Sequence, residues 1–250
     1  MLVKVSIITV CFNSEKTIKN TIKSVLNQNY PNIEYIIIDG GSQDNTLSTI
    51  ESYHQSITKV VSEKDNGMYD ALNKGIDLST GDLIGILHSD DIFYSNDVVK
   101  DIVRKIMLSK TDSIYGDLDY VKEQNLNQVI RNWKSGPYVR KRLLFGWMPP
   151  HPTFFIKKEI FDKYGKYNLS FGTAADYELI VRLLYKYKIS CEYLPNVITK
   201  MRMGGLSNMS ISNRINAHLQ DWRAWKINDI SNFPIWVLLK PIRKIHQYFF

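Results

Sequence analysis

With 250 residues, the chain is long enough for one large α/β domain or for one domain with an appendage. Hydrophobic residues make up 44% of it, which allows a sizeable core and excludes a disordered chain or a repeat array. The net charge of +7 favours an anionic partner such as a nucleotide, a nucleic acid or a membrane surface, although a basic surface also serves solubility alone.

Cysteine usage and hydropathy indicate the compartment. Cys11 and Cys191 are far apart and lack metal-ligand spacing, so we interpret them as buried thiols in a reducing compartment. The apolar opening at 3–12 is interrupted by Lys4 and lacks a small-residue cleavage site, which favours a strand over a signal peptide. No apolar run approaches the roughly 18–20 residues that span a bilayer. We therefore expect a cytoplasmic protein that is not integral to a membrane.

The first part of the chain alternates predicted strands with predicted helices. Strands are expected at 3–10, 33–38, 58–62 and 83–87, and helices at 14–28 (capped by Ser14), from 44 or 45 onward, and at 69–78. This alternation predicts a mostly parallel α/β sheet flanked by helices. Ligands of such sheets bind beyond the carboxyl ends of the strands, where this chain carries polar residues at 9–13, 39–42, 63–67 and 88–91.

The second part alternates less regularly. Strands are expected at 113–120, 128–133 and 153–156, the first two antiparallel, and helices at 157–164, 174–187 and 211–227. No Gly/Ser linker divides the chain, so we treat 1–230 as one domain with a ligand-binding half at about 1–112 and a second half at about 113–230. The end, 231–250, mixes aromatic and basic residues. It is either a helix lying on an anionic membrane or one packed on the domain or on a second copy of the chain.

Two adjacent carboxylates, Asp90 and Asp91, directly follow the fourth predicted strand. Paired carboxylates at a strand end are suited to a hard divalent cation, which prefers oxygen ligands. The alternative is an Asp-rich turn or a helix cap. Asp39 also follows a buried strand, and the glycines after it let a ligand approach the backbone. Its carboxylate could accept a hydrogen bond from a base NH or a ribose hydroxyl.

Five segments together resemble family 2 of the glycosyltransferases. They are SIITVCFN at 6–13, IIIDGGSQD at 36–44, DNGMYDALNKG at 65–75, the stretch from Gly81-Asp82 to Asp90-Asp91, and AADYEL at 174–179. Each segment is weak alone, but the order and spacing of all five are specific, and the resemblance covers about 3–184. It implies a GT-A fold, in which a Rossmann-like, mostly parallel sheet is joined by a smaller mixed or antiparallel portion. It also implies a nucleotide-sugar donor, most often a UDP-sugar, and a divalent metal, manganese or magnesium.

The resemblance also implies roles for particular residues. Thr9 and Phe12 match positions around the nucleotide base, and Asp39 matches the carboxylate that reads it. Asp90 matches a residue that meets the ribose, and Asp91 a metal ligand. Asp176 matches the general base of inverting members. Positions at the donor are also matched by Gly67, Asn73 and Lys74, the last in place of an arginine that some members aim at the pyrophosphate.

Several residues keep two interpretations. Glu178 competes with Asp176, but positions two apart on a helix do not face the same way. His88 stands where many relatives have a carboxylate or asparagine, and it is either a metal ligand or a hydrogen-bonded supporting residue. His151, in a proline-rich turn, resembles a donor-site loop residue or is only part of a rigid turn. The glycines at 204–207 form either a flap over the diphosphate or a plain loop.

The predicted function is therefore metal-dependent, inverting transfer of a sugar to a carbohydrate or lipid-linked saccharide in polysaccharide biosynthesis. A dinucleotide-binding oxidoreductase is excluded by the absence of G-x-G-x-x-G. Nucleic-acid binding is disfavoured because Arg and Lys are scattered rather than interleaved with aromatics on one face. The remaining alternative is a non-catalytic scaffold or sugar-binding subunit that kept the fold. Retention of both Asp91 and Asp176 favours the enzyme.

Overall fold

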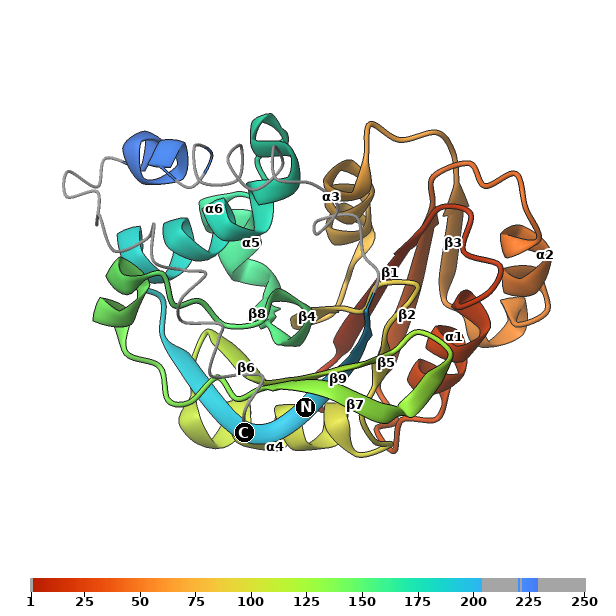
Figure 1. Cartoon of the computed structure of the whole chain (residues 1–250), viewed down its shortest axis with the longest axis horizontal. Helices are drawn as coiled ribbons and strands as arrows, with labels where there is room; N and C mark the ends of the chain where they lie inside the picture. Colours follow the sequence, from red (N-terminus) through yellow and green to blue (C-terminus); the bar gives the residue numbers. More distant parts are fainter. Residues whose placement is uncertain (1, 204–219, 221, 229–250) are drawn as a thin grey trace.

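One mixed β-sheet organises the part of the chain that the computed structural model describes, residues 2–203, 220 and 222–228 (Figure 1). The strand order is β3-β2-β1-β4-β8-β6-β9-β5, and β7 pairs with β6 beside this path. The strands are β1 (Val5–Cys11), β2 (Ile33–Asp39), β3 (Lys59–Ser62), β4 (Leu83–Ile86), β5 (Ile92–Phe93), β6 (Ser113–Lys122), β7 (Asn125–Trp133), β8 (Phe155–Lys157) and β9 (Cys191–Arg202).

The α-helices of this part are α1 (Ile18–Leu26), α2 (Thr46–Glu51), α3 (Met68–Leu78), α4 (Val98–Ser109), α5 (Lys158–Tyr164) and α6 (Ala175–Ile180). A π-helix, Val181–Lys186, continues α6, and together they cover the single helix expected at 174–187. Short 3-10 turns occupy His54–Ser56, Arg140–Phe145, His151–Thr153 and Leu169–Ala174.

The parallel part of the sheet is built from the first four strands. β1 pairs in parallel with β2 and with β4, and β2 pairs in parallel with β3. Every residue of β1 and β4 is buried, as expected of continuous apolar runs covered on both faces. The parallel sheet flanked by helices that the alternation in the first part of the chain predicted is confirmed.

The remaining strands make the mixed part. β8 runs antiparallel to both β4 and β6, and β7 runs antiparallel to β6, as expected. β9 was not expected: it pairs in parallel with β6 and antiparallel with β5. Glu192, Pro195 and Lys200 interrupt its apolar pattern, so its alternation is weak. Its strand conformation depends on pairing with a strand distant in sequence, which no local pattern reports.

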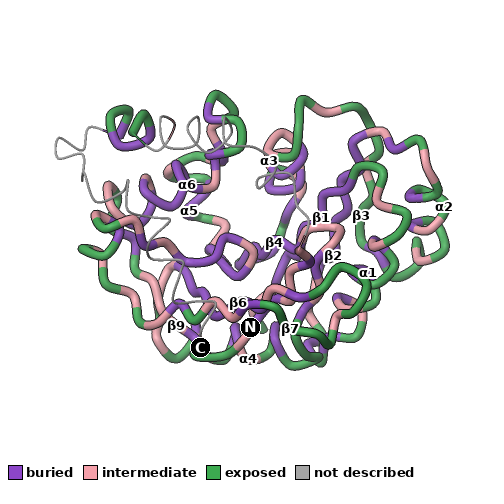
Figure 2. Tube along the Cα trace, in the orientation of Figure 1, coloured by how far each residue is buried: buried purple, intermediate pink, exposed green. Residues whose placement is uncertain are grey.

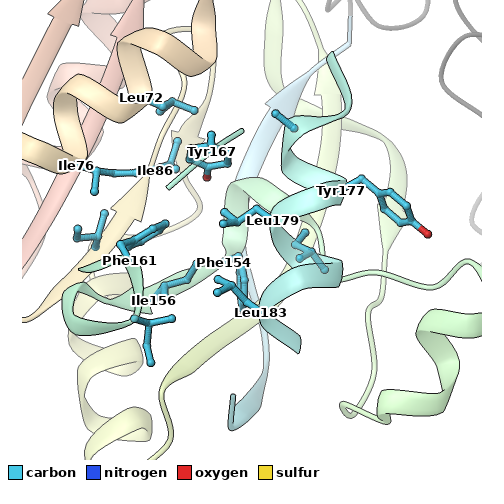
Figure 3. Close-up of a cluster of buried hydrophobic side chains, with 14 of the residues drawn as sticks. Leu72, Ile76, Ile86, Phe154, Ile156, Phe161, Tyr167, Tyr177, Leu179 and Leu183 are labelled. Atoms are coloured by element: carbon cyan, nitrogen blue, oxygen red, sulfur yellow. The ribbon is translucent and has the colours of Figure 1, made fainter. Parts of the chain in front are cut away.

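Helices cover both faces of the sheet, and the buried side chains form two separate cores. Figure 2 shows that buried residues run along the strands and along one side of the helices. On one face, Ile8 and Ile36 belong to a core with α3, α5 and α6. Figure 3 shows this core, where Leu72 and Ile76 lie on the α3 side. On the other face, Ile7 belongs to a core with α1, α2 and α4. The resulting three layers leave the strand ends open to form a site.

Helix α1 begins later than predicted. Its first residue is Ile18, the residue before it is Thr17, and Ser14 does not cap it. The Ser14 hydroxyl lies 2.9 Å from the hydroxyl of Ser89, and its backbone carbonyl accepts hydrogen bonds from the amides of Thr17 and Ile18. The prediction of Ser14 as the cap was wrong because its hydroxyl contacts the loop after β4.

Some expectations fall outside the described residues. The glycines at 204–207 and the basic aromatic segment at 231–250 are among them, and the helix expected at 211–227 is described only at 220 and 222–227, where it is helical. Within the described ranges, no helix combines the length and apolarity that crossing a membrane requires.

A buried carboxylate joins the amino ends of three elements. Glu34 of β2 accepts hydrogen bonds from the Ser6 hydroxyl at 2.6 Å, and from the Thr80 backbone amide and hydroxyl at 2.8 and 2.6 Å. Lys4 pairs with it at 2.9 Å. Burial alone would raise the pKa of Glu34, but these hydrogen bonds outweigh it and lower that pKa from 4.5 to about 2.

We expect Glu34→Gln to reduce the free energy of unfolding near neutral pH by about 2 kcal/mol, after allowance for the half-exposed Lys4. Because the folded-state pKa is depressed, the stabilisation is present above 4.5 and is lost as the pH falls toward 2. Urea unfolding of the wild type and the variant across this range measures it, with Glu123→Gln, an exposed turn carboxylate, as control. A stability difference that is the same at both ends of the range would contradict the prediction.

Candidate active site

Hydrogen bonds between loops join the carboxyl ends of the first strands. The Gly40 amide donates to the Cys11 carbonyl at 2.9 Å, and the Glu63 amide donates to the Asp39 carbonyl at 3.0 Å. The Asn13 amide donates to the Ser42 hydroxyl at 2.8 Å. The polar strand ends therefore form one continuous edge, where a parallel sheet binds ligands.

Asp39 is fully buried at the end of β2. One of its oxygens accepts from the amides of Gly41 and Ser42 at 3.0 Å and from the Ser62 hydroxyl at 2.7 Å. The other accepts from the Ser42 hydroxyl and from the Cys11 thiol. Burial raises the pKa of Asp39, yet the hydrogen bonds lower it overall. The carboxylate thus organises the loop, and no oxygen of it is exposed to a ligand.

Thr9 and Phe12, both expected around the base, lie differently. Thr9 is fully buried, and its hydroxyl lies 3.1 Å from that of Tyr35 on the α1 side of the sheet. Its side chain is therefore beneath the site edge. Phe12, just past β1, exposes 60% of its surface and can stack on a flat ring.

The three residues from the α3 region serve the scaffold in this structure. Gly67 precedes α3 with a φ of 107°, a conformation that favours glycine. Asn73 exchanges two 2.9 Å hydrogen bonds with the backbone of Tyr167. Lys74 pairs with Glu63 at 2.7 Å and more distantly with Asp70. A contact of any of them with a donor stays a prediction.

Asp90 and Asp91 lie between β4 and β5 and differ in exposure. Asp90 is half-buried, whereas Asp91 is 1% exposed and neither of its carboxylate oxygens accepts a hydrogen bond from the residues that the structure describes. Burial and the neighbouring charge of Asp90 raise the pKa of Asp91 well above its usual value, and Arg202 opposes this in part. A buried carboxylate that accepts no hydrogen bonds destabilises the fold unless a cation neutralises its charge.

Asp90 and Asp91 therefore suit a divalent cation as part of its ligand set. The described residues include no group of three or more His, Cys, Asp or Glu side chains that could hold a metal. Sites for Mg²⁺-like ions commonly use one or two carboxylates together with substrate phosphates and water. Asp90 and Asp91 suit such a site, in which the ligand supplies the remaining oxygens.

Arg202, at the end of β9, was not singled out in the sequence. It is 6% exposed, and one of its terminal nitrogens donates to the Asp90 carbonyl at 3.3 Å. Its Nε lacks a partner among the described residues. Its backbone amide and its positive charge both lie close enough to Asp91 to lower the pKa of that carboxyl. The unexpected strand β9 is what brings this cation to the site.

A row of aromatic and imidazole rings leads from the Asp90–Asp91 pair to Asp176. The ring centroids of His88 and His151 are 6.0 Å apart, and His151 Nε2 lies 2.6 Å from the Tyr167 hydroxyl. Tyr167 is 5.2 Å from Tyr69 between ring centroids. Burial and the charge of Asp176 raise the pKa values of both tyrosines. The sequence did not single out Tyr69 or Tyr167 as a site residue.

The two histidines are neutral at pH 7. Burial is the main cause that lowers the pKa of His88 to about 4, while the charges of Asp90 and Asp176 oppose it. Burial likewise lowers the pKa of His151 to about 4. His88 is therefore within electrostatic reach of both Asp90 and Asp176. The structure thus brings the loop after β4 close to Asp176 of α6, although the two are distant in sequence.

Glu178, the competitor of Asp176, is bound to the scaffold. It is 1% exposed and forms a two-point ion pair with Arg182 at 2.9 and 3.1 Å. Asn228 donates to it at 3.1 Å. Arg182 in turn donates to the backbone carbonyls of residues 164–166. Glu178 thus stabilises α6 rather than facing a substrate, which leaves Asp176, half-buried at the start of α6.

Comparison with known proteins gives the family. The model of glycosyl transferase family 2 matches residues 6–165, more than half of the chain. The chain belongs to glycosyltransferase family 2. An uncharacterized glycosyltransferase of Mycobacterium tuberculosis is 36% identical over 182 residues, 71% of this chain and 68% of that protein. A Mycobacterium bovis glycosyltransferase of PGL/p-HBAD biosynthesis is 28% identical, over 81% of this chain and 78% of its own length.

Solved structures show the GT-A fold for this family 2 glycosyltransferase. Staphylococcus aureus TarS 1–349, in complex with UDP, superposes with a TM-score of 0.73 at 16% identity, covering 97% of this chain and 72% of TarS. A mannosyltransferase of Pyrobaculum calidifontis, in complex with GDP-Man and Mn²⁺, gives 0.65 at 15% identity, covering 99% and 70%. The resemblance to family 2 and the fold that it implied are both confirmed.

Proposed function

We propose that this glycosyltransferase works with inversion and moves a sugar from a nucleoside-diphosphate-sugar, preferably a UDP-sugar, to a hydroxyl of a carbohydrate or lipid-linked saccharide. The observation that carries the proposal is the convergence of Asp176 with His88 and Asp90 at the end of β4. The UDP of TarS and the GDP-Man and Mn²⁺ of the archaeal mannosyltransferase support the donor class and a metal.

Asp176 is the proposed general base. Its oxygen takes the proton of the acceptor hydroxyl as that hydroxyl attacks the anomeric carbon opposite the departing diphosphate, and the configuration inverts. Inversion needs a single carboxylate, because no covalent sugar–enzyme bond forms. Tyr69 and Tyr167 lie beside Asp176, and His151 holds Tyr167 in place through their 2.6 Å hydrogen bond. They restrict water around the carboxylate.

Asp90 and Asp91 would hold the divalent cation. When bound, such a cation neutralises charge that grows on the departing diphosphate. Arg202 supplies a fixed positive charge beside the same pair. The remaining donor contacts in the proposal are stacking of the base on Phe12 and an approach of the ribose to Asp90.

We further propose that the enzyme builds a surface polysaccharide or glycolipid on the cytoplasmic face of a membrane. The biosynthetic role in the name of the Mycobacterium bovis relative supports this. The basic and aromatic residues at 231–250 support peripheral binding to an anionic bilayer or pairing with a second copy.

Thermal unfolding with UDP, GDP and dTDP, each with manganese and with chelator, tests the donor assignment. A nucleotide at about 100 times its Kd stabilises the fold by about 2.7 kcal/mol, which for a chain of this size raises Tm by roughly 5–10 °C. We expect one nucleotide to give such a rise with manganese and a much smaller one with chelator. No rise with any nucleotide in either condition would reject the donor site and favour the non-catalytic scaffold.

A further inference from the structure

The carboxylate of Asp65 lies directly over Gly40, at the carboxyl end of β2. A Cβ built on Gly40 would be 2.6 Å from Asp65 Oδ2, so no residue larger than glycine fits there without moving the carboxylate. Glycine at position 40 therefore leaves a space that Asp65 fills. Asp65 belongs to the loop between β3 and α3, which reaches back across the end of β2.

Three carboxylates lie near the end of β1, and two of them already accept hydrogen bonds on both oxygens. Asp39 accepts five hydrogen bonds from surrounding groups. Asp44 accepts from the amide and hydroxyl of Thr46 and from the amide of Glu15. Asp65 differs: Oδ1 accepts from the Gly67 amide at 2.9 Å, and Oδ2 has no hydrogen-bond or ion-pair partner among residues 2–203, 220 and 222–228.

The negative charges at this edge disfavour the diphosphate of a nucleotide and favour its base. Besides burial, the negative charges of Asp39 and Asp65 raise the pKa of the Cys11 thiol, so both lie close to the end of β1. Such an edge repels a diphosphate, whereas Arg202 and a cation held by the Asp90–Asp91 pair would attract one at the other strand ends. A neutral ring carrying N–H donors is attracted instead, and exposed Phe12 next to Cys11 offers it a stacking face.

Resting on the proposed nucleotide-sugar donor, we infer that Asp65, held over Gly40, is the residue that reads the base, by accepting the N–H of a uracil or guanine ring on Oδ2. The fixed Oδ1–Gly67 contact orients the acceptor before the ligand arrives. Cytosine and adenine present a ring nitrogen acceptor at the equivalent position and are repelled by the carboxylate. Asp39 then acts as a positioning residue that shapes the loop carrying Gly40.

Calorimetric titration of the full chain with UDP and with UDP methylated at uracil N3 tests the inference, and GDP methylated at guanine N1 serves in the same way if GDP is the ligand. We expect the wild type to bind the unmethylated nucleotide at least tenfold more tightly. Asp65→Asn keeps the acceptor for the Gly67 amide, so it should fold, and we expect it to lose about tenfold to a hundredfold in affinity and most of the discrimination.

Gly40→Ala provides a second variant, because its methyl group displaces the Asp65 carboxylate without changing any charge, and we expect the same loss of discrimination. Asp101→Asn, a half-buried carboxylate of α4 that pairs with Arg104, is the matched control and should bind as the wild type does. Discrimination retained in Asp65→Asn, or preference for CDP or ADP, would overturn the inference and leave the donor site standing. Failure of the wild type to bind any nucleotide would overturn the proposed function as well.

Discussion

Asp176→Asn should lower the rate of nucleoside-diphosphate release from the donor by about 10²–10⁴-fold, because an amide cannot take the proton of the attacking hydroxyl. Donor affinity should stay within about twofold, because the base acts on the acceptor. The measurement is kcat for release of the nucleotide identified by thermal unfolding, together with Kd by calorimetry. The side chains have nearly the same volume, so the rings of Tyr69 and Tyr167 keep their packing.

The neighbouring carboxylate gives a matched contrast. Glu178→Gln breaks the buried ion pair with Arg182, and we expect it to reduce the free energy of unfolding by roughly 2–4 kcal/mol while the folded protein keeps its rate. Transfer that survives in Asp176→Asn and disappears in folded Glu178→Gln would exchange the two assignments. An Asp176→Asn rate within about tenfold of the wild type would remove the general-base role.

Asp91→Asn should abolish the metal-dependent part of nucleotide binding. In the wild type, the two Asp91 oxygens are buried and have no hydrogen-bond partner within the described part of the chain, a state that a bound cation would relieve. We expect the affinity for the nucleotide in manganese to fall by about tenfold to a hundredfold. It should then equal the affinity that the wild type shows with chelator. Calorimetry with manganese and with chelator measures both values in each protein.

One further variant and a check of folding separate a metal role from a purely structural one. Arg202→Lys keeps the positive charge, so manganese dependence should persist in it. Circular dichroism checks that Asp91→Asn folds. Unchanged manganese dependence in a folded Asp91→Asn protein would remove Asp91 from the metal site and leave Asp90 as the carboxylate to test.

Much of this site was predictable because its residues follow strands with strong local signals. β1, β2 and β4 are continuous apolar runs; Asp39 is the last residue of β2, and Asp90 and Asp91 lie in the short loop after β4. A parallel sheet places all such ends on one edge, so sequence order alone predicted where a ligand would bind. The five segments added the family, which the family model confirms.

The interpretation of single residues was less predictable. Asp39 and Asp65 both follow strands with glycines nearby, and the sequence favoured Asp39 for the base. Only the folded loops show that five donors surround Asp39 while one oxygen of Asp65 has no partner among the residues described by the structure. The hydrogen bonds to Asp39 depend on Cys11 of β1, Ser42 of the loop after β2 and Ser62 of β3 coming together, and no spacing along the chain encodes that.

The sequence by itself determined the layered parallel sheet, the family and the strand-end carboxylates, because apolar runs and turn residues act over a few positions. The tertiary structure decided which carboxylate has oxygens left for a ligand, that Arg182 and Asn228 hold Glu178, and that β9 brings Arg202 beside Asp91. These outcomes depend on contacts between residues that are distant along the chain. Burial and long-range pairing set the charge and the exposure of each group, and both arise only when the sheet and its helices are assembled.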